Sequence, residues 1–191
     1  MFGNLRRFGA LIVSTAFFLT IASASDLPRL SFNELTDNSE LIVSGHVTRT
    51  WTDWDADHKY IWTHFELTVS STHKGTAGQT VDIAEPGGQV DGIGMSISGA
   101  AGYRVGDSVM VFLSRMPNGY LRTAGFGQGK YTVDAAGRVH GEVALKTAET
   151  VAVGTGGAPP AGAVRSLDGM SVGQVGQMVA ARVRTRGGSA Q

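Results

Sequence analysis

The chain has 191 residues, with 16 Lys and Arg against 16 Asp and Glu, 27 glycines and no cysteine. A formal charge of zero argues against a strongly basic nucleic-acid-binding protein, so we expect no nucleic-acid partner. The lack of cysteine excludes a disulfide framework, a thiolate metal site and a cysteine nucleophile. The length fits one folded domain, and a glycine content about twice the usual share indicates many tight turns.

Residues 1–24 have the pattern of a secretory signal peptide. Arg6 and Arg7 precede an apolar run of 13 residues from Ala10 to Ala22, and small residues occupy positions 22–24. This run is shorter than the ~20 residues that span a bilayer, so we expect cleavage before Ser25 rather than a membrane anchor. The protein is therefore expected to be exported, either periplasmic or secreted, with no integral membrane segment after cleavage. Loss of two arginines makes the mature chain slightly acidic.

The mature chain is dominated by predicted β-strands. Ser31 with Glu34 three residues later is a capping-box pattern that predicts a short helix over residues 32–38. Alternating apolar segments bounded by turn residues then predict strands over residues 40–51, 59–70, 80–84, 94–98, 108–114, 120–125, 130–134 and 139–144. Gly45 inside the first strand predicts a bulge or a bend. Short strands at about ten-residue spacing predict a mainly all-β fold, a small OB-like antiparallel barrel that is closed or partly open.

Four parts follow from these patterns: the signal peptide (1–24), a β-barrel domain (25–146), a flexible linker rich in Gly, Ala and Pro (147–165), and a C-terminal helix with its tail (166–191). Ser171 is placed to cap that helix, in which apolar residues recur at helical spacing. Its C-terminal end carries Arg182, Arg184 and Arg186, as the helix dipole favours.

Aromatic side chains gather around the first predicted hairpin, and these are the candidate binding residues: Trp51, Trp54, Tyr60 and Trp62. Strand alternation places Tyr60, Trp62 and His64 on one face and the more apolar set, which should face the core, on the other. An exposed aromatic strip would indicate a binding surface. The alternative is that these rings cover one end of the barrel or pack under the C-terminal helix.

Asp53, Asp55 and Asp57 alternate in the same hairpin, as at the start of a calcium loop. The rest of that motif fails, because His58 occupies the glycine position and His64 occupies the position of the bidentate glutamate. We therefore expect a solvated acidic hairpin with at most a weak calcium site, and no metal or cofactor.

Catalytic motifs give little support for an enzyme. No Gly-x-Ser-x-Gly nucleophile motif occurs, and the histidine spacings match no metal motif. His64 and Glu66 share a strand face, so the alternative function is a hydrolase with a non-standard His/Asp/Glu site. The patterns favour a non-enzymatic binding module instead.

The run Glu40 to Val47 (ELIVSGHV), followed by His73-Lys74-Gly75 and Thr80-Val-Asp-Ile, resembles OB-type barrels of the netrin/TIMP-like class. More closely, residues 38–134 resemble a family of uncharacterised bacterial exported proteins. That likeness is carried by Pro86-Gly87-Gly88, Val90-Asp91-Gly92, Gly106 to Leu113 and Gly125 to Tyr131. The resemblance implies an OB-like barrel and carries no established activity.

TIMP-like inhibitors bind the zinc of a protease through an N-terminal cysteine, which this chain lacks, so the likeness to them is one of architecture only. The expected partner is an envelope or extracellular protein, such as an exported protease, or a glycan.

Overall fold

A computed structural model describes residues 29–141 and 166–188; the predicted signal peptide and linker lie outside the described residues. The fold is mainly β. Its elements in chain order are α1 (Phe32–Asn38), β1 (Leu41–Trp54), β2 (Ile61–Lys74), β3 (Thr80–Pro86), β4 (Gly88–Val90), β5 (Ile93–Met95), β6 (Ser108–Arg115), β7 (Leu121–Thr123), the 3₁₀ helix η1 (Phe126–Gly129), β8 (Lys130–Val133), β9 (Val139–Gly141) and α2 (Val172–Gly188).

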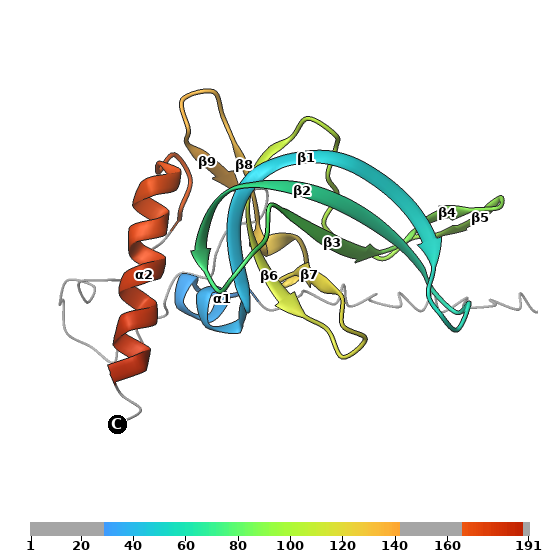
Figure 1. Cartoon of the computed structure of the whole chain (residues 1–191), viewed down its shortest axis with the longest axis horizontal. Helices are drawn as coiled ribbons and strands as arrows, with labels where there is room; N and C mark the ends of the chain where they lie inside the picture. The colour runs from blue at the N-terminus through green and yellow to red at the C-terminus, as the bar shows by residue number, and fades with distance from the viewer. Residues whose placement is uncertain (1–28, 142–165, 189–191) are drawn as a thin grey trace, which may run out of the picture.

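Five strands form a ring (Figure 1). Their order is β1-β2-β3-β7-β6, and β6 also pairs with β1. All of these pairings are antiparallel except β3–β7, which is parallel and has the single register pair Ile83↔Leu121 within the described residues. The predicted barrel-like β fold is thus confirmed in its coarse form, with its weakest joint between β3 and β7. Strands β8 and β9 extend from β6 outside the ring, and β4 with β5 forms a separate hairpin.

Strand β1 changes register against β2 between Ser44 and Gly45, which confirms the irregularity predicted at this glycine. A Cβ atom at Gly45 would collide with the backbone oxygen of Thr68 on β2. A residue without a side chain is therefore required where the two strands approach each other this closely.

Two apolar cores share β1 and β6. One fills the ring and includes Val43, Phe65, Leu67, Ile83, Val109 and Val111. The other lies on the outer face of β1 and β6 under the two helices, and includes Leu35, Ile42, Met110, Phe112, Val175 and Val179. Because β6 and the first residues of β1 are buried on both faces, residues 41–43 and 109–113 are continuous apolar runs rather than alternating ones.

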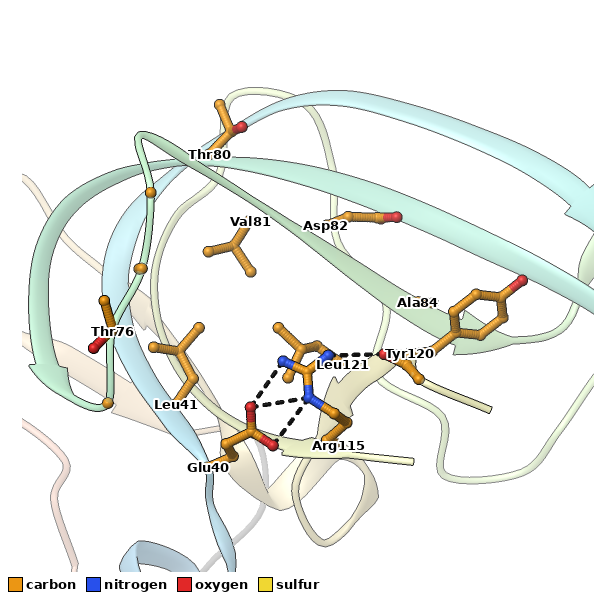
Figure 2. Close-up of a pocket in the computed structure, with 14 residues that line it drawn as sticks. Glu40, Leu41, Thr76, Thr80, Val81, Asp82, Ala84, Arg115, Tyr120 and Leu121 are labelled. Carbon is orange, nitrogen blue, oxygen red and sulfur yellow. Dashed lines mark hydrogen bonds and ion pairs between the residues drawn. The ribbon is translucent and has the colours of Figure 1, made fainter. Parts of the chain in front are cut away.

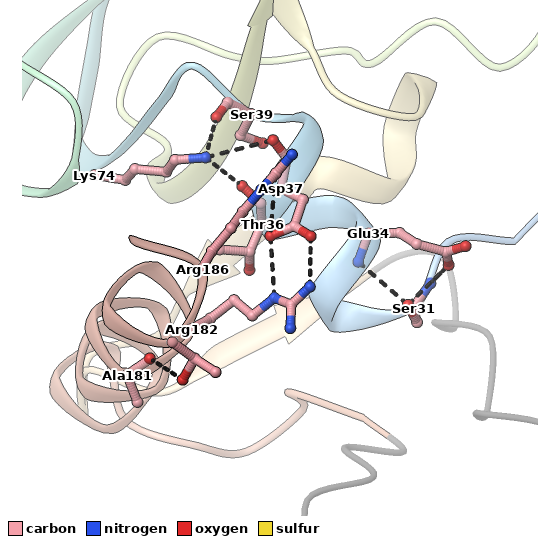
Figure 3. A network of polar contacts seen from close by, with 10 residues as sticks. Ser31, Glu34, Thr36, Asp37, Ser39, Lys74, Ala181, Arg182 and Arg186 are labelled. Atoms are coloured by element: carbon pink, nitrogen blue, oxygen red, sulfur yellow. Dashed lines mark hydrogen bonds and ion pairs between the residues drawn. The ribbon is translucent and has the colours of Figure 1, made fainter. Parts of the chain in front are cut away.

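Polar contacts join α1 to β2 and to α2 (Figure 3). Lys74 Nζ donates to the carbonyl oxygens of Thr36 (2.7 Å) and Ser39 (2.6 Å) at the C-terminal end of α1. Asp37 accepts hydrogen bonds from Nε (3.0 Å) and Nη2 (2.6 Å) of Arg182 on α2. The Arg182 guanidinium holds the pKa of Asp37 below its usual value. The basic end of α2 is therefore engaged by α1.

Helix α2 lies close to β2 at Gly176, and this contact gives a paired prediction. A Cβ atom there would lie 2.6 Å from Nδ1 of His73, whose Nε2 is 3.1 Å from Ser44 Oγ. We expect Gly176→Ala to lower the free energy of unfolding by ~1–3 kcal/mol, because overpacking outweighs the better helix propensity of alanine. Urea denaturation followed by circular dichroism measures the change.

The matched control for this substitution is Gly173→Ala on the same helix. A Cβ atom at Gly173 has Ser171 Oγ at 4.0 Å as its nearest neighbour, so alanine should stabilise the protein by up to ~1 kcal/mol. Equal stability of the two variants would contradict the tight docking of α2 on β2.

Candidate functional site on the outer face of β1, β2 and β3

Directly opposite residues on antiparallel strands share a face, and this rule places three of the predicted site residues. Trp51 on β1 pairs with His64 on β2, and Asp53 pairs with Trp62. Trp51, Trp62 and His64 therefore lie on the outer face of the ring. The helices pack against the outer face of β1 and β6 instead, so they leave this part of the sheet open.

The rings on this face form an aromatic cluster, defined here as Trp51, Trp62, His64 and Tyr120. The indole of Trp51 stacks on the His64 imidazole, with centroids 4.9 Å apart and planes 9° apart. Tyr120, from the loop between β6 and β7, meets His64 edge-on at 5.4 Å and Trp62 edge-on at 5.1 Å. The guanidinium of Arg49 lies 4.3 Å from the centroid of Trp51. Strands β1 and β2 and the distant β6–β7 loop thus contribute rings to one aromatic layer.

Of the two arrangements that the sequence left open, the exposed one applies to Tyr60, which is 55% exposed, and the covered one applies to Trp62, which is 9% exposed. Trp62 does lie on the outer face, but Tyr120 packs against it from outside. Trp51 and Trp54 are half-buried. The surface available to a partner is therefore Tyr60 with the outer parts of Trp51 and Trp54, supported by a buried Trp62.

His64 is also buried, at 7% exposure, and its Nδ1 lies 3.0 and 3.1 Å from the carboxylate oxygens of Asp82 on β3. This geometry makes Nδ1–H the donor and leaves the Asp82 side chain half exposed. Glu66, the other residue of the predicted hydrolase pair, instead accepts a hydrogen bond from Thr48 and pairs with Arg49 at 3.8 Å. His64 therefore positions Asp82 rather than Glu66.

A pocket of about 600 Å³ opens beside the aromatic cluster, at the weak joint between β3 and β7; we call it the seam pocket (Figure 2). Asp82 and Tyr120 line it together with a bidentate ion pair in which Arg115 donates to Glu40 at 2.8 to 3.0 Å. The Glu40 carboxylate raises the pKa of Arg115 above its usual value. The apolar side chains that line it are listed here: Leu41, Val81, Ala84 and Leu121.

The acidic residues of the β1–β2 hairpin stabilise its turn. Asp53 Oδ1 accepts from the backbone N–H of Trp54 (2.8 Å), and Asp55 Oδ1 accepts from that of Lys59 (2.7 Å). Asp57 is exposed. Within residues 29–141 and 166–188, no three His, Cys, Asp or Glu side chains are grouped so that they could hold a metal ion. Two of the three aspartates thus have a structural role in the turn.

A buried ion pair at the same joint was not indicated by the sequence. Glu85 on β3 accepts from the backbone N–H of Thr123 (2.8 Å) and from Arg122 Nε (3.2 Å), both on β7. Burial raises the pKa of Glu85, and these hydrogen bonds offset part of that effect. The ion pair links β7 to β3 at the joint where the backbone pairing between neighbouring ring strands is shortest.

No protein-family model matches this chain, and no curated protein is significantly similar to it in sequence. Neither helix in the described part of the chain has the length and apolar character needed to cross a bilayer. The candidate site therefore rests on its geometry alone.

Proposed function

We propose that the mature chain is an exported, non-enzymatic binding module that recognises an envelope or extracellular protein, such as an exported protease, or a glycan. The binding surface is formed by Trp51, Trp54, Tyr60 and Trp62 with the adjoining seam pocket. The observation that carries the proposal is the aromatic cluster on the face that the helices leave open, next to a pocket that combines charged and apolar groups. Such combinations are typical of binding sites.

An OB-type barrel is part of the proposal. Numbered along the ring strands alone, the order is 1-2-3-5-4 with strand 4 returning to strand 1, and the third and fifth strands are parallel. OB barrels are five-stranded, and they bind ligands on the face of strands 2 and 3 and on the loops between strands 1 and 2 and strands 4 and 5. The corresponding parts here are the β2–β3 face, the acidic hairpin and the loop that carries Tyr120, so the assignment supports the same surface.

A hydrolase acting through His64 and Glu66 has less support. Trp51 and Tyr120 pack on the buried His64 ring, and Nδ1 is directed at Asp82. A general base has to reach the substrate proton, and this imidazole is enclosed.

Export has a direct test. Protein recovered from the periplasm or the medium of cells that make the full chain should begin at Ser25, as read by N-terminal sequencing. The substitution Ala24→Arg should block this processing, because signal peptidases require small residues at the cleavage site. Recovery of an intact Met1 in the exported fraction would contradict the proposal.

Binding at the proposed face is tested by site-specific photocrosslinking in the same cells. A photoreactive phenylalanine analogue replaces Tyr60 on the face, or Val183 on α2 as a comparably exposed control (55% and 41% exposed). We expect a discrete adduct from position 60 and none from position 183. The Trp51→Ala substitution should reduce the adduct at least about tenfold, because the half-buried indole supplies contact area. Adducts from both positions, or from neither, would contradict this surface.

A further inference from the structure

The backbone groups of β3 alternate in direction, and two hydrogen bonds fix which residues face β2. Val69 N–H donates to Gln79 O and Gly87 N–H donates to Ile61 O, both at 2.8 Å. These bonds lie at the two ends of one uninterrupted antiparallel register. The odd-numbered residues of β3 therefore point their N–H and C=O groups toward β2. Thr80, Asp82 and Ala84 point theirs to the other side, toward the seam.

On that other side β3 has very little strand pairing. Within the described residues β7 pairs with β3 only at Ile83↔Leu121, whereas β2 pairs with β3 from Thr80 to Pro86. Because Asp82 and Ala84 face the seam, this parallel pair uses the C=O of Asp82 and the N–H of Ala84. The N–H and C=O of Thr80 and the N–H of Asp82 are left as a short strand edge without a strand partner among the described residues. Free edges of this kind accept an additional strand through main-chain hydrogen bonds.

The seam pocket lies along this edge and has the composition that an added strand needs (Figure 2). Leu41, Val81 and Leu121 offer apolar contacts to side chains that point inward. Glu40 and Arg115 neutralise each other's charge, whereas among the described residues Asp82 forms an ion-pair contact with the largely buried His64 and with no Lys or Arg. The exposed side of the pocket therefore carries an excess of negative charge.

We propose that the seam pocket binds an extended, basic peptide segment of a partner protein, which adds as a short strand to the Thr80–Asp82 edge of β3. Inward-pointing side chains of the peptide contact Leu41, Val81 and Leu121, and a Lys or Arg on the outward face pairs with Asp82. This inference rests on the proposed function, because it takes the β1–β3 face as the binding surface and specifies what one part of it recognises.

The probe is the acetylated and amidated hexapeptide Thr-Val-Lys-Val-Lys-Thr, compared with Thr-Val-Glu-Val-Glu-Thr. Fluorescence anisotropy of the labelled peptides with the full-length mature protein measures affinity. We expect the lysine peptide to bind with a dissociation constant below about 1 mM, and the glutamate peptide to bind at least about tenfold more weakly. N-methylation of each peptide amide in turn should abolish binding at alternate positions only, because a strand directs every second residue's amide to its neighbour.

The protein side of the test uses amide hydrogen exchange and three variants. The amides of Thr80 and Asp82 should gain protection when the lysine peptide binds. Thr80→Pro removes a seam-facing N–H without removing a bond to β2, and Asp82→Asn removes the charge; each should weaken binding at least about tenfold. The control is Asp91→Asn, which makes the same chemical change in the exposed β4–β5 turn. Asp91 has a φ of 51°, which asparagine tolerates. This variant should bind the lysine peptide as the native protein does.

Three results would overturn the inference: no binding of either peptide, N-methylation effects without a period of two, or protection of Thr80 and Asp82 by chitotetraose and not by peptide. The proposed function is tested independently of the peptide, by the crosslink at position 60. A crosslink at that position without peptide addition at the seam would leave the binding module in place and remove this inference alone.

Discussion

Replacing Glu85 with alanine should lower the free energy of unfolding by about 3–5 kcal/mol, because it leaves the Arg122 guanidinium buried without its carboxylate. The Glu85 and Arg122 side chains are only 3% and 14% exposed. Arg122 Nη2 already has no hydrogen-bond partner among the described residues, so little can replace the lost contact. Urea denaturation followed by tryptophan fluorescence measures the change.

Glu40→Ala is the matched control, since it also removes a carboxylate from an arginine beside the seam. The Arg115–Glu40 side chains are about half exposed, so solvent screens this ion pair and its loss should cost much less than loss of the buried pair. The double variant Glu85→Met/Arg122→Met should recover most of the stability lost in Glu85→Ala, because no charge is then left buried. A loss for Glu85→Ala no greater than that for Glu40→Ala would show that the buried pair does not hold the joint.

The substitution Gly45→Ala should destabilise the protein by about 3 kcal/mol, at the upper end of what overpacking produces. The added methyl group would meet the backbone oxygen of Thr68, and Val69 Cα lies 3.2 Å from the same point. Backbone atoms cannot rotate away as a side chain can, so β1 and β2 would have to separate where both help to form the ring. Urea denaturation again reports the loss.

Gly78→Ala is the comparison for this second prediction. A Cβ atom at Gly78, in the β2–β3 turn, would have Thr80 O at 3.9 Å as its nearest neighbour, an ordinary contact. Its stability should stay within about 0.5 kcal/mol of that of the native protein. If the two alanine variants were equally stable, the bulge at Gly45 would not require glycine.

Features that depend on neighbouring residues could be predicted from the sequence. Alternation located most strands to within a few residues, and Gly45 predicted the register shift in β1. Three short elements were missed or misplaced: β4 and the 3₁₀ helix η1 were not predicted, and β5 lies at Ile93–Met95 rather than 94–98. Segments of three or four residues contain too little periodicity to be recognised.

The candidate site was only half predictable, because its decisive contacts join distant segments. Alternation placed Trp62 and His64 correctly on the outer face, but burial of Trp62 depends on Tyr120, which no local pattern connects to it. The cross-strand pair of His64 and Asp82 requires the β2–β3 register, and the Glu85–Arg122 pair requires the parallel β3–β7 contact. Both of these side-chain pairs form only when the strands have assembled into the ring.

The two cores that share β1 and β6 also bear on how this protein can change over evolutionary time. A substitution in β6 or in residues 41–43 of β1 affects the packing on both faces, so these positions tolerate few alternatives. The outer face of β3 and of the first half of β2, around Trp62 and His64, supports neither helix, and its exposed residues can vary with little effect on the rest of the fold. The architecture thus separates the residues that maintain the structure from those that can diversify toward new partners.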